Sequence, residues 1–202
     1  MYSKLPNLVI AFHGCDIETY ENVLYKHQHL TSSNNDYDWL GNGIYFWEQN
    51  LERAWQWAND KARNVKSGTK TPAVIGAVID LGCCLNLTDG KSINILKKQY
   101  EIFEIEMFIA GKDMPINKNV KNNTDVLLRQ LDCAVIENLH EERRGNCEFL
   151  FDSVRGIFFE GNAIYKGSEF REKTHIQLCI RNPNCIKGYF APLSVNPSYC
   201  IP

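Results

Sequence analysis

The sequence has no long hydrophobic run. A membrane-spanning helix needs about 18 consecutive apolar residues, whereas the longest early apolar stretch, Leu8 to Phe12, has only the length of a strand. The N-terminal segment contains Lys4 and Pro6 but no apolar core followed by small residues, so it does not resemble a signal peptide. We therefore expect a cytoplasmic protein without a membrane partner.

The positive and negative charges of the chain nearly balance, and its cysteines have no regular spacing. Its 22 Lys and Arg residues nearly balance its 24 Asp and Glu residues, which excludes a basic surface over the whole molecule but not a local basic patch. Eight cysteines are present, yet no two of them form a Cys-x-x-Cys pair. Because this spacing favours neither a zinc centre nor a disulfide framework, we expect reduced thiols and no metal site.

Internal repeats and low-complexity segments are absent as well. The 202 residues are 44% hydrophobic, 11% aromatic and 23% charged, which is typical of a folded domain and excludes a disordered chain. The polar segment 113–123 is the one candidate boundary, but neither side of it carries enough elements for a core of its own. We predict a single domain covering residues 1–202.

The hydrophobic periodicity predicts an α+β fold. Strand patterns lie at both ends of the sequence and helical patterns lie between them, unlike the regular alternation of a doubly wound sheet. Asp16, Asn50 and Ser92 are placed to cap the first three helices. The expected strands are 7–12, 44–47, 73–81, 149–159, 174–181 and 185–190, and the expected helices are 16–27, 50–65, 92–109 and 124–140.

Two early segments carry residues that suit a ligand site. His13 and Gly14 follow the first strand, where an imidazole and a bare backbone would stand at a sheet edge; a purely structural histidine is the alternative. In Gly41–Phe46, two glycines frame a turn, after which Tyr45 and Phe46 point to opposite faces. One of these rings faces the core, and the other faces either a cleft or a second core.

A third segment, Thr174–Arg181, alternates between an apolar and a polar face. The polar face is either exposed to solvent or forms the wall of a cleft, and the alternation alone does not decide between them. The apolar face carries Ile176, Leu178 and Ile180, and the polar face carries His175, Gln177, Cys179 and Arg181.

In order and spacing, these segments resemble the ADP-ribosyltransferases of the diphtheria-toxin and poly(ADP-ribose) polymerase lineage, whose triad is His, Tyr and then Glu, Asp or Gln. Phe12-His13-Gly14 matches the first motif, and Gly41–Phe46 matches Gly-x-Gly-Ile-Tyr-Phe, the most specific part. Gln177 stands where the third triad residue is expected, and 152–156 resembles the segment before the acceptor-side loop. The resemblance extends from about residue 8 to 190 and is weak in the middle helices.

The resemblance implies two split, strongly curved antiparallel sheets, flanked by helices, with NAD in the crevice between them. It implies that His13 binds a ribose hydroxyl, that the Gly14 backbone holds the nicotinamide carboxamide, and that Tyr45 packs on the nicotinamide or its ribose. Gly43 belongs to the same NAD-binding set. Nicotinamide would leave through an oxocarbenium-like state, and ADP-ribose would pass to a protein or nucleic-acid acceptor.

One departure from the family concerns the third triad residue, which is usually Glu. Gln177 can bind a hydroxyl, but it carries no charge and cannot act as a base. Polymer elongation is therefore not expected, and mono-transfer, slow NAD hydrolysis and loss of activity all stay open. Glu160 is the candidate carboxylate for activating the acceptor, with Glu172 as a second; solvated loop charges are the alternative for both.

A second departure lies on the helix after the second motif. Gln56 stands where many relatives carry a tyrosine that stacks on nicotinamide, and Trp55 and Trp57 flank it. Helix geometry separates these two side chains by about 200°. Because Trp55 continues the apolar stripe through Leu51 and Ala54, we expect Trp55 in the core and Trp57 over the nicotinamide.

The sequence thus predicts an NAD-dependent mono-ADP-ribosyltransferase, of the kind used as a toxin or defence effector and neutralised by an antitoxin or immunity protein. Two alternatives stay open. Gln177 favours a catalytically inactive domain that binds NAD or ADP-ribose, and release of ADP-ribose without an acceptor would identify an NAD glycohydrolase.

Overall fold

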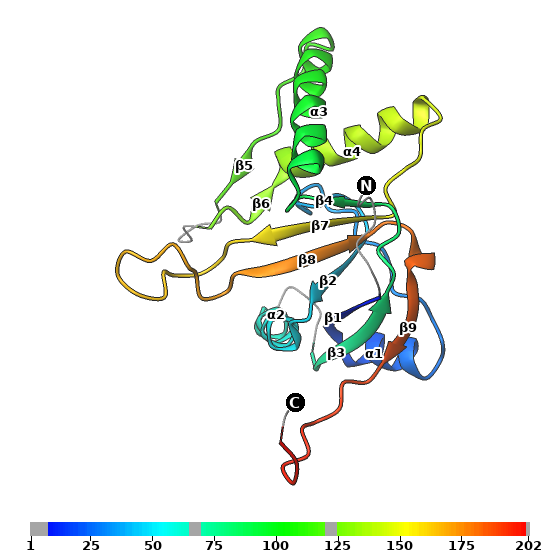
Figure 1. Ribbon diagram of the computed structural model, residues 1–202, viewed down its shortest axis with the longest axis vertical. Coiled ribbons are helices and arrows are strands. Elements are labelled where there is room, and N and C mark those ends of the chain that lie inside the picture. The colour runs from blue at the N-terminus through cyan, green and yellow to red at the C-terminus, as the bar shows by residue number, and fades with distance from the viewer. Residues whose placement is uncertain (1–7, 65–69, 120–124, 201–202) are drawn as a thin grey trace.

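The computed structural model describes residues 8–64, 70–119 and 125–200 and confirms the α+β class. Its largest element is one seven-stranded sheet with the order β4-β7-β8-β2-β1-β3-β9 (Figure 1). Its strands are β1 (Val9–Asp16), β2 (Ile44–Glu48), β3 (Pro72–Ile79), β4 (Cys84–Asn86), β7 (Ser153–Phe158), β8 (His175–Ile180) and β9 (Ile186–Phe190). A separate two-stranded hairpin pairs β5 (Asn117–Lys118) with β6 (Leu128–Arg129).

The sheet differs from the expected pair of antiparallel sheets in two ways. All neighbouring strands of the sheet are antiparallel except β4 and β7, which run parallel, so the sheet is mixed. It is also continuous in pairing, although β1 and β2 are joined by only two residue pairs, Ala11 with Glu48 and Phe12 with Trp47. This is the shortest pairing between neighbouring strands of the sheet.

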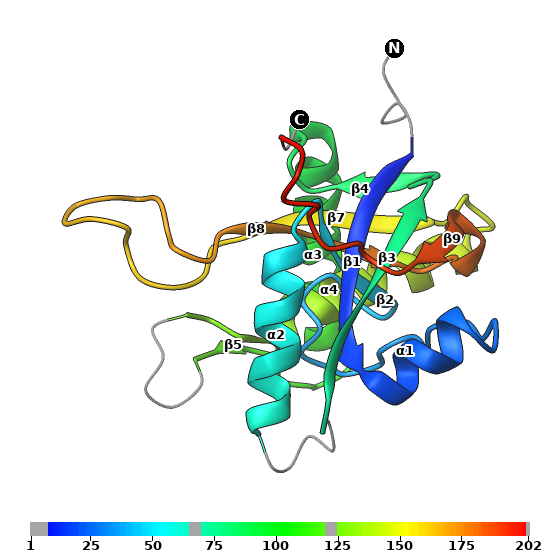
Figure 2. The same cartoon turned by 90° about the horizontal axis from the view of Figure 1, so that it is seen from below.

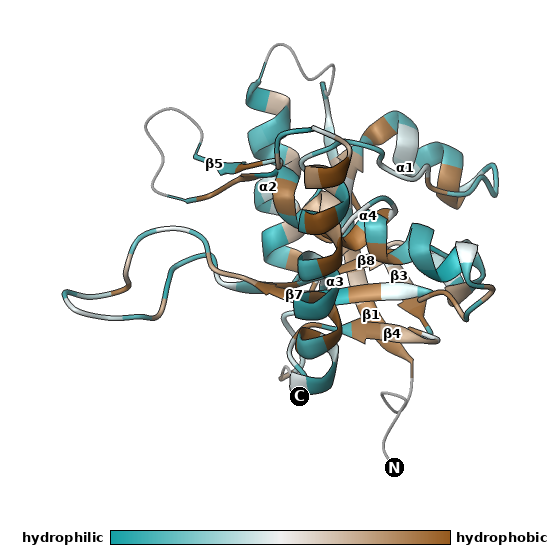
Figure 3. Ribbon diagram, turned by 90° about the horizontal axis from the view of Figure 1, so that it is seen from above, coloured by the Kyte–Doolittle hydropathy of each residue, from teal (hydrophilic) through white to brown (hydrophobic). Residues whose placement is uncertain are grey.

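Helices cover both faces of the sheet. The helices are α1 (Ile17–Leu24), α2 (Leu51–Arg63), α3 (Gly90–Ile109) and α4 (Gln130–Gly145). Val23 of α1 joins the core on one face with Phe46, which is fully buried; burial of a side chain of this size stabilises by about 1.5–3 kcal/mol. On the opposite face, α2 packs beside Trp47, and α4 packs on Val154 of β7, so the sheet is buried on both sides (Figure 3).

Most predicted elements are confirmed, with corrections at their ends. Asp16 and Asn50 accept the expected capping hydrogen bonds, from Glu18 N–H and Arg53 N–H. The cap of α3 is Asp89 and not Ser92, which lies in the first turn. The helix expected from residue 124 begins only at Gln130, because residues 128–129 pair as β6 in the hairpin.

The segment between β7 and β8 forms an arm that extends away from the sheet (Figure 2). Its base is tied to the body by the N–H of Gly161, which donates to the Asp125 carboxylate at 2.9 Å. Four large apolar side chains on the arm are more than half exposed: Phe159, Ile164, Tyr165 and Phe170. Such exposure gives the arm no core of its own, so its position depends on the contacts at its base.

No helix within the described ranges is long and apolar enough to cross a membrane. Within the same ranges, no group of three or more His, Cys, Asp or Glu side chains is arranged to hold a metal ion.

Candidate functional site

The three sequence motifs meet on adjacent strands. In the sheet, β2 lies between β8 and β1, so the strand with Tyr45 separates the strand with Gln177 from the strand with His13. Tyr45 stands opposite Cys179, and Trp47 stands opposite Gln177, so Tyr45 and Gln177 are diagonal neighbours on one face. The fold therefore places the three motif strands side by side, although β8 follows β2 by more than a hundred residues in the sequence.

The junction of β1 and β2 opens at His13. The pairing of β1 with β3 runs from Val9 to Asp16, whereas its pairing with β2 covers only Ala11 and Phe12. The first strand thus continues through His13 and Gly14, where the sequence suggested that it would end. Beyond Phe12, the imidazole of His13 spans the opening, and its Nδ1 donates to the carbonyl oxygen of Tyr45 at 2.7 Å. We call this opening, bounded by His13, Gly14 and Tyr45, the β1–β2 gap.

The hydrogen bond fixes the chemical state of His13. A carbonyl oxygen only accepts, so Nδ1 carries the proton and Nε2 keeps a lone pair. Burial lowers the pKa of His13; the Tyr45 carbonyl opposes this shift and the nearby charge of Lys61 adds to it. His13 is therefore neutral at physiological pH and keeps a hydrogen-bond acceptor on Nε2.

Gly14 presents backbone groups to the gap. The N–H of Gln49 donates to the Ile10 carbonyl at 3.0 Å, so the backbone groups of Ile10 point toward β2. Backbone groups of every second residue in a strand point to the same side, so the N–H and C=O of Gly14 also point toward β2. Its α-carbon lies against α2, where an added Cβ would stand 2.5 Å from the Ala54 carbonyl and 3.1 Å from the Trp57 ring. Glycine is thus required here for close packing of helix on strand.

Tyr45 is held rigidly by its hydroxyl. The oxygen accepts from Leu40 N–H at 3.0 Å and donates to the Gly41 carbonyl at 2.8 Å, which closes the turn before β2. Burial, and then the neighbouring Cys179, raise its pKa well above its usual value, so the phenol stays neutral. By strand alternation, its side chain leaves the sheet on the face opposite His13, which reaches Tyr45 through the backbone.

Gln177 and Gly43 are each engaged by neighbouring residues. The Oε1 of Gln177 accepts from Trp39 Nε1–H at 2.5 Å, a contact over 138 residues that the sequence analysis did not foresee. Gly43 is buried; its N–H and carbonyl both bond Ser33, and an added Cβ would meet the Cys179 sulfur at 2.5 Å. The structure therefore places Gly43 in the packing between β2 and β8 and not at the β1–β2 gap.

The two tryptophans of α2 are distinguished by the structure. Trp57 packs on Trp47, with ring centroids 5.4 Å apart, and a Cβ added to Gly14 would stand 3.1 Å from its ring, so Trp57 lies beside the gap. Its position over the nicotinamide stays a prediction. Trp55 is 40% exposed, which makes its predicted core position wrong. The buried side of α2 is carried by Ala54 and Ala58, whose small side chains let the helix approach β1 closely.

Glu160 lies in a buried ion pair with Arg53. One of its oxygens accepts from Arg53 Nη2 at 2.6 Å, and the side chains of Arg53 and Glu160 are only 8% and 14% exposed. Lys173 lies 3.9 Å from the other oxygen. Arg53 also faces the Trp47 ring at 6.0 Å. The sequence analysis missed Arg53, because an arginine on a helix is usually solvated and no local pattern reveals a partner 107 residues away.

Cys15, next to the first motif, is buried, and burial raises the pKa of its thiol to about 12, with Asp16 adding to the shift. It therefore stays a protonated thiol and not a nucleophile at neutral pH.

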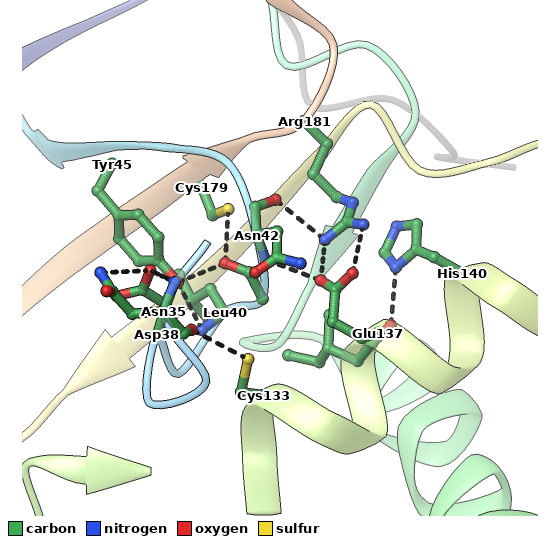
Figure 4. Close-up of polar contacts among 12 residues, drawn as sticks. Asn35, Asp38, Leu40, Asn42, Tyr45, Cys133, Glu137, His140, Cys179 and Arg181 are labelled. Atoms are coloured by element: carbon green, nitrogen blue, oxygen red, sulfur yellow. Dashed lines mark hydrogen bonds and ion pairs between the residues drawn. The ribbon is translucent and has the colours of Figure 1, made fainter. Parts of the chain in front are cut away.

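A polar network supports the turn that carries Tyr45 (Figure 4). Arg181 binds both oxygens of Glu137, and its Nη1 donates to the Asn42 carbonyl at 3.0 Å. Glu137 also accepts from Asn42 N–H at 2.7 Å. Burial disfavours the Glu137 carboxylate, but these donors outweigh it and hold its pKa below the usual range. The turn at 40–43 is thus fixed from α4 and from the end of β8.

Comparison with known proteins gives little functional information. The chain is 26% identical over 197 residues to an uncharacterised protein of Methanocaldococcus jannaschii, covering 87% of this chain and 83% of that protein. No family model matches the chain. No solved structure matches it.

Proposed function

We propose that the protein is a mono-ADP-ribosyltransferase with a fold of the ADP-ribosyltransferase type, which uses NAD as a substrate. The observation that supports it best is the opening of the sheet between β1 and β2, where His13 and Gly14 present an acceptor nitrogen and backbone amide groups to one gap. A ribose hydroxyl can donate to His13 Nε2, and a carboxamide pairs with a backbone N–H and C=O because it carries the complementary groups.

In this proposal, catalysis comes from protein groups that hold NAD in position and whose dipoles are already oriented before the reaction. The Trp57 ring borders the gap beside Gly14, and an aromatic face attracts the positively charged nicotinamide ring. Tyr45, whose ring is locked by two backbone hydrogen bonds, forms a rigid wall on β2. Gln177, on the next strand, is oriented by Trp39 and is the third member of the set. Such prior orientation lowers the entropy cost of reaching the transition state.

A specific observation favours the second candidate, a domain that binds NAD or ADP-ribose without turnover. Gln177 supplies no negative charge to an oxocarbenium-like state, and the candidate acceptor-side carboxylate, Glu160, is neutralised by Arg53. An NAD glycohydrolase is the third candidate, and it differs from the transferase in needing no acceptor.

The proposal predicts a gain of activity for Gln177→Glu. A carboxylate at this position can still accept from Trp39 N–H, and it adds negative charge beside the developing positive charge on the ribose. We expect nicotinamide release from NAD, measured in the presence of cell extract, to rise by about tenfold or more, which corresponds to about 1.4 kcal/mol in the barrier. Gln177→Ala should lower the rate below that of the native protein.

The matched control is Gln28→Glu, which makes the same change at an exposed glutamine after α1 and should leave the rate unchanged. Bound NAD without nicotinamide release, in both the native protein and Gln177→Glu, would reject the transferase in favour of the binding domain. Release that does not require extract would identify the hydrolase.

A further inference from the structure

The C-terminal half of α3 exposes large apolar side chains. The helix runs away from the sheet (Figure 1) and packs on α4, where Gln99 is buried and donates to Asn138 at 2.7 Å. Helices that are apolar on more than one side are normally buried on those sides. Here, four apolar side chains near the end of α3 are between 38% and 84% exposed: Ile102, Ile105, Phe108 and Ile109. Such a surface is typical of a protein interaction site.

Three of these side chains form one stripe along the helix. At about 100° per residue, Ile102, Ile105 and Ile109 lie within about 60° of one another around the helix axis. Their spacing of three and then four residues is the one by which a helix packs along the seam of another helix. Phe108 lies beside them, about 60° from Ile105. We call Ile102, Ile105 and Ile109 the α3 stripe.

Acidic side chains border the α3 stripe on both sides. Glu101 and Glu106 are exposed and lie about 40° outside the stripe, one on each side of it. Glu106 accepts from the Asn138 amide at 2.7 Å, which holds this carboxylate in place. The last turn of α3 contains no basic residue, although the C-terminal end of a helix carries partial negative charge. The α3 stripe therefore lies in a negative electrostatic potential.

This charge pattern disfavours a second copy of the chain on the same face. If two α3 stripes paired about a centre at Ile105, their Glu106 side chains would lie within about 3 Å of each other along the helix axis. Like charges at the flanks of a helix pair destabilise it. An anionic membrane surface is disfavoured for the same reason. The face instead fits a helix that carries Lys or Arg on both sides of an apolar seam.

We propose that the α3 stripe is the docking site for a basic amphipathic helix of a partner protein. The apolar seam of that helix packs on the α3 stripe, and its Lys or Arg side chains face Glu101 and Glu106. Lys98, one turn before Ile102, bounds the site on the side of the sheet. None of these residues belongs to the β1–β2 gap, so the inference does not depend on the proposed function.

The proposal is tested by fluorescence anisotropy, with labelled model peptides titrated with the full chain. The probes are two amphipathic helices of about 18 residues, or five turns. They share a leucine seam, which lysine borders in one peptide and glutamate in the other. The lysine peptide should bind at least about tenfold more tightly than the glutamate peptide. Ile105→Asp should weaken its binding by about tenfold or more, whereas Ile164→Asp, at an exposed isoleucine of the arm, should not.

Charge reversal distinguishes this site from a general attraction of basic peptides to acidic groups. The double variant Glu101→Lys with Glu106→Lys should bind the glutamate peptide more tightly than the lysine peptide, and loss of fold cannot produce such a reversal. The matched control is Glu18→Lys with Glu21→Lys, which changes the net charge equally at exposed residues of α1. This control should keep the native preference.

Equal affinity of the native protein for the two peptides would overturn the proposal, as would no saturable binding of either, or binding that Ile105→Asp and the charge reversal leave unchanged. Sedimentation of the protein alone tests the alternative occupant. A monomer supports the proposal, whereas a dimer that Ile105→Asp dissociates would assign the α3 stripe to a second copy and overturn it. NAD is absent from these measurements, so their failure leaves the proposed function untouched.

Discussion

Glu160→Ala should destabilise the protein by about 3–5 kcal/mol. The substitution leaves the guanidinium of Arg53 buried without a counter-charge, and an uncompensated buried charge is among the most destabilising changes that a single substitution makes. Two nitrogens of Arg53, Nε and Nη1, already have no hydrogen-bond partner among the described residues, so little remains to stabilise the charge. Equilibrium unfolding in urea measures the loss.

The matched control for this prediction is Asp60→Ala. Asp60 pairs with Arg63 at 3.3 Å, but these side chains are 53% and 80% exposed, so the loss should stay below about 1 kcal/mol. If Glu160→Ala does not fold, the double variant Arg53→Leu with Glu160→Leu provides the comparison, because it removes both charges and should recover much of the stability. A Glu160→Ala protein as stable as Asp60→Ala would contradict the buried ion pair.

His13→Ala should lower kcat/KM for nicotinamide release by about 10- to 100-fold. The substitution removes the hydrogen bond that spans the β1–β2 gap and the acceptor nitrogen offered to the ribose, and a lost ligand hydrogen bond of this kind costs about 1–3 kcal/mol. His29→Ala, at an exposed histidine, is the matched control and should retain the native rate. Circular dichroism of both variants separates a loss of function from a loss of fold.

The same residue predicts the pH dependence of the reaction. Protonation of Nε2 turns the acceptor into a donor, and burial lowers the pKa of His13 below its usual 6.5. The rate should therefore hold as the pH falls to 6.5 and decrease only at lower pH, through the pKa of His13. An unchanged rate in His13→Ala, or a decrease already above pH 6.5 that His13→Ala abolishes, would contradict the assigned role.

Local patterns in the sequence predicted most of the helices and strands, because the signals that define them are local. The Asn50 side chain caps α2 as expected, and the β-branched run in 73–81 forms β3. The start of α4 was misplaced because the apolar residues 126–128, which suit a helix, lead instead into the β5–β6 hairpin. The pairing of residues 117–118 with 128–129 depends on tertiary contacts, which the hydrophobic periodicity of the sequence does not show.

For the candidate site, the sequence could name the motif residues but not their geometry or their partners. The sequence placed Tyr45 and Gln177 on strands and His13 just after one, but it could not reveal that the first strand continues through His13, which reaches Tyr45 through a backbone carbonyl. Trp55 was misassigned because an apolar stripe does not show which of its edges a helix buries. The partners Trp39 and Arg53 were invisible because contacts across more than a hundred residues leave no local pattern.

The most direct test of the central claim is incubation of the native protein with NAD labelled in its adenylate half, with and without cell extract, followed by separation of macromolecules from small molecules. We expect the label to become attached to a protein or nucleic acid in the extract, in step with nicotinamide release, and His13→Ala to reduce both. Label that stays in intact NAD, with no nicotinamide released under either condition, would contradict a transferase.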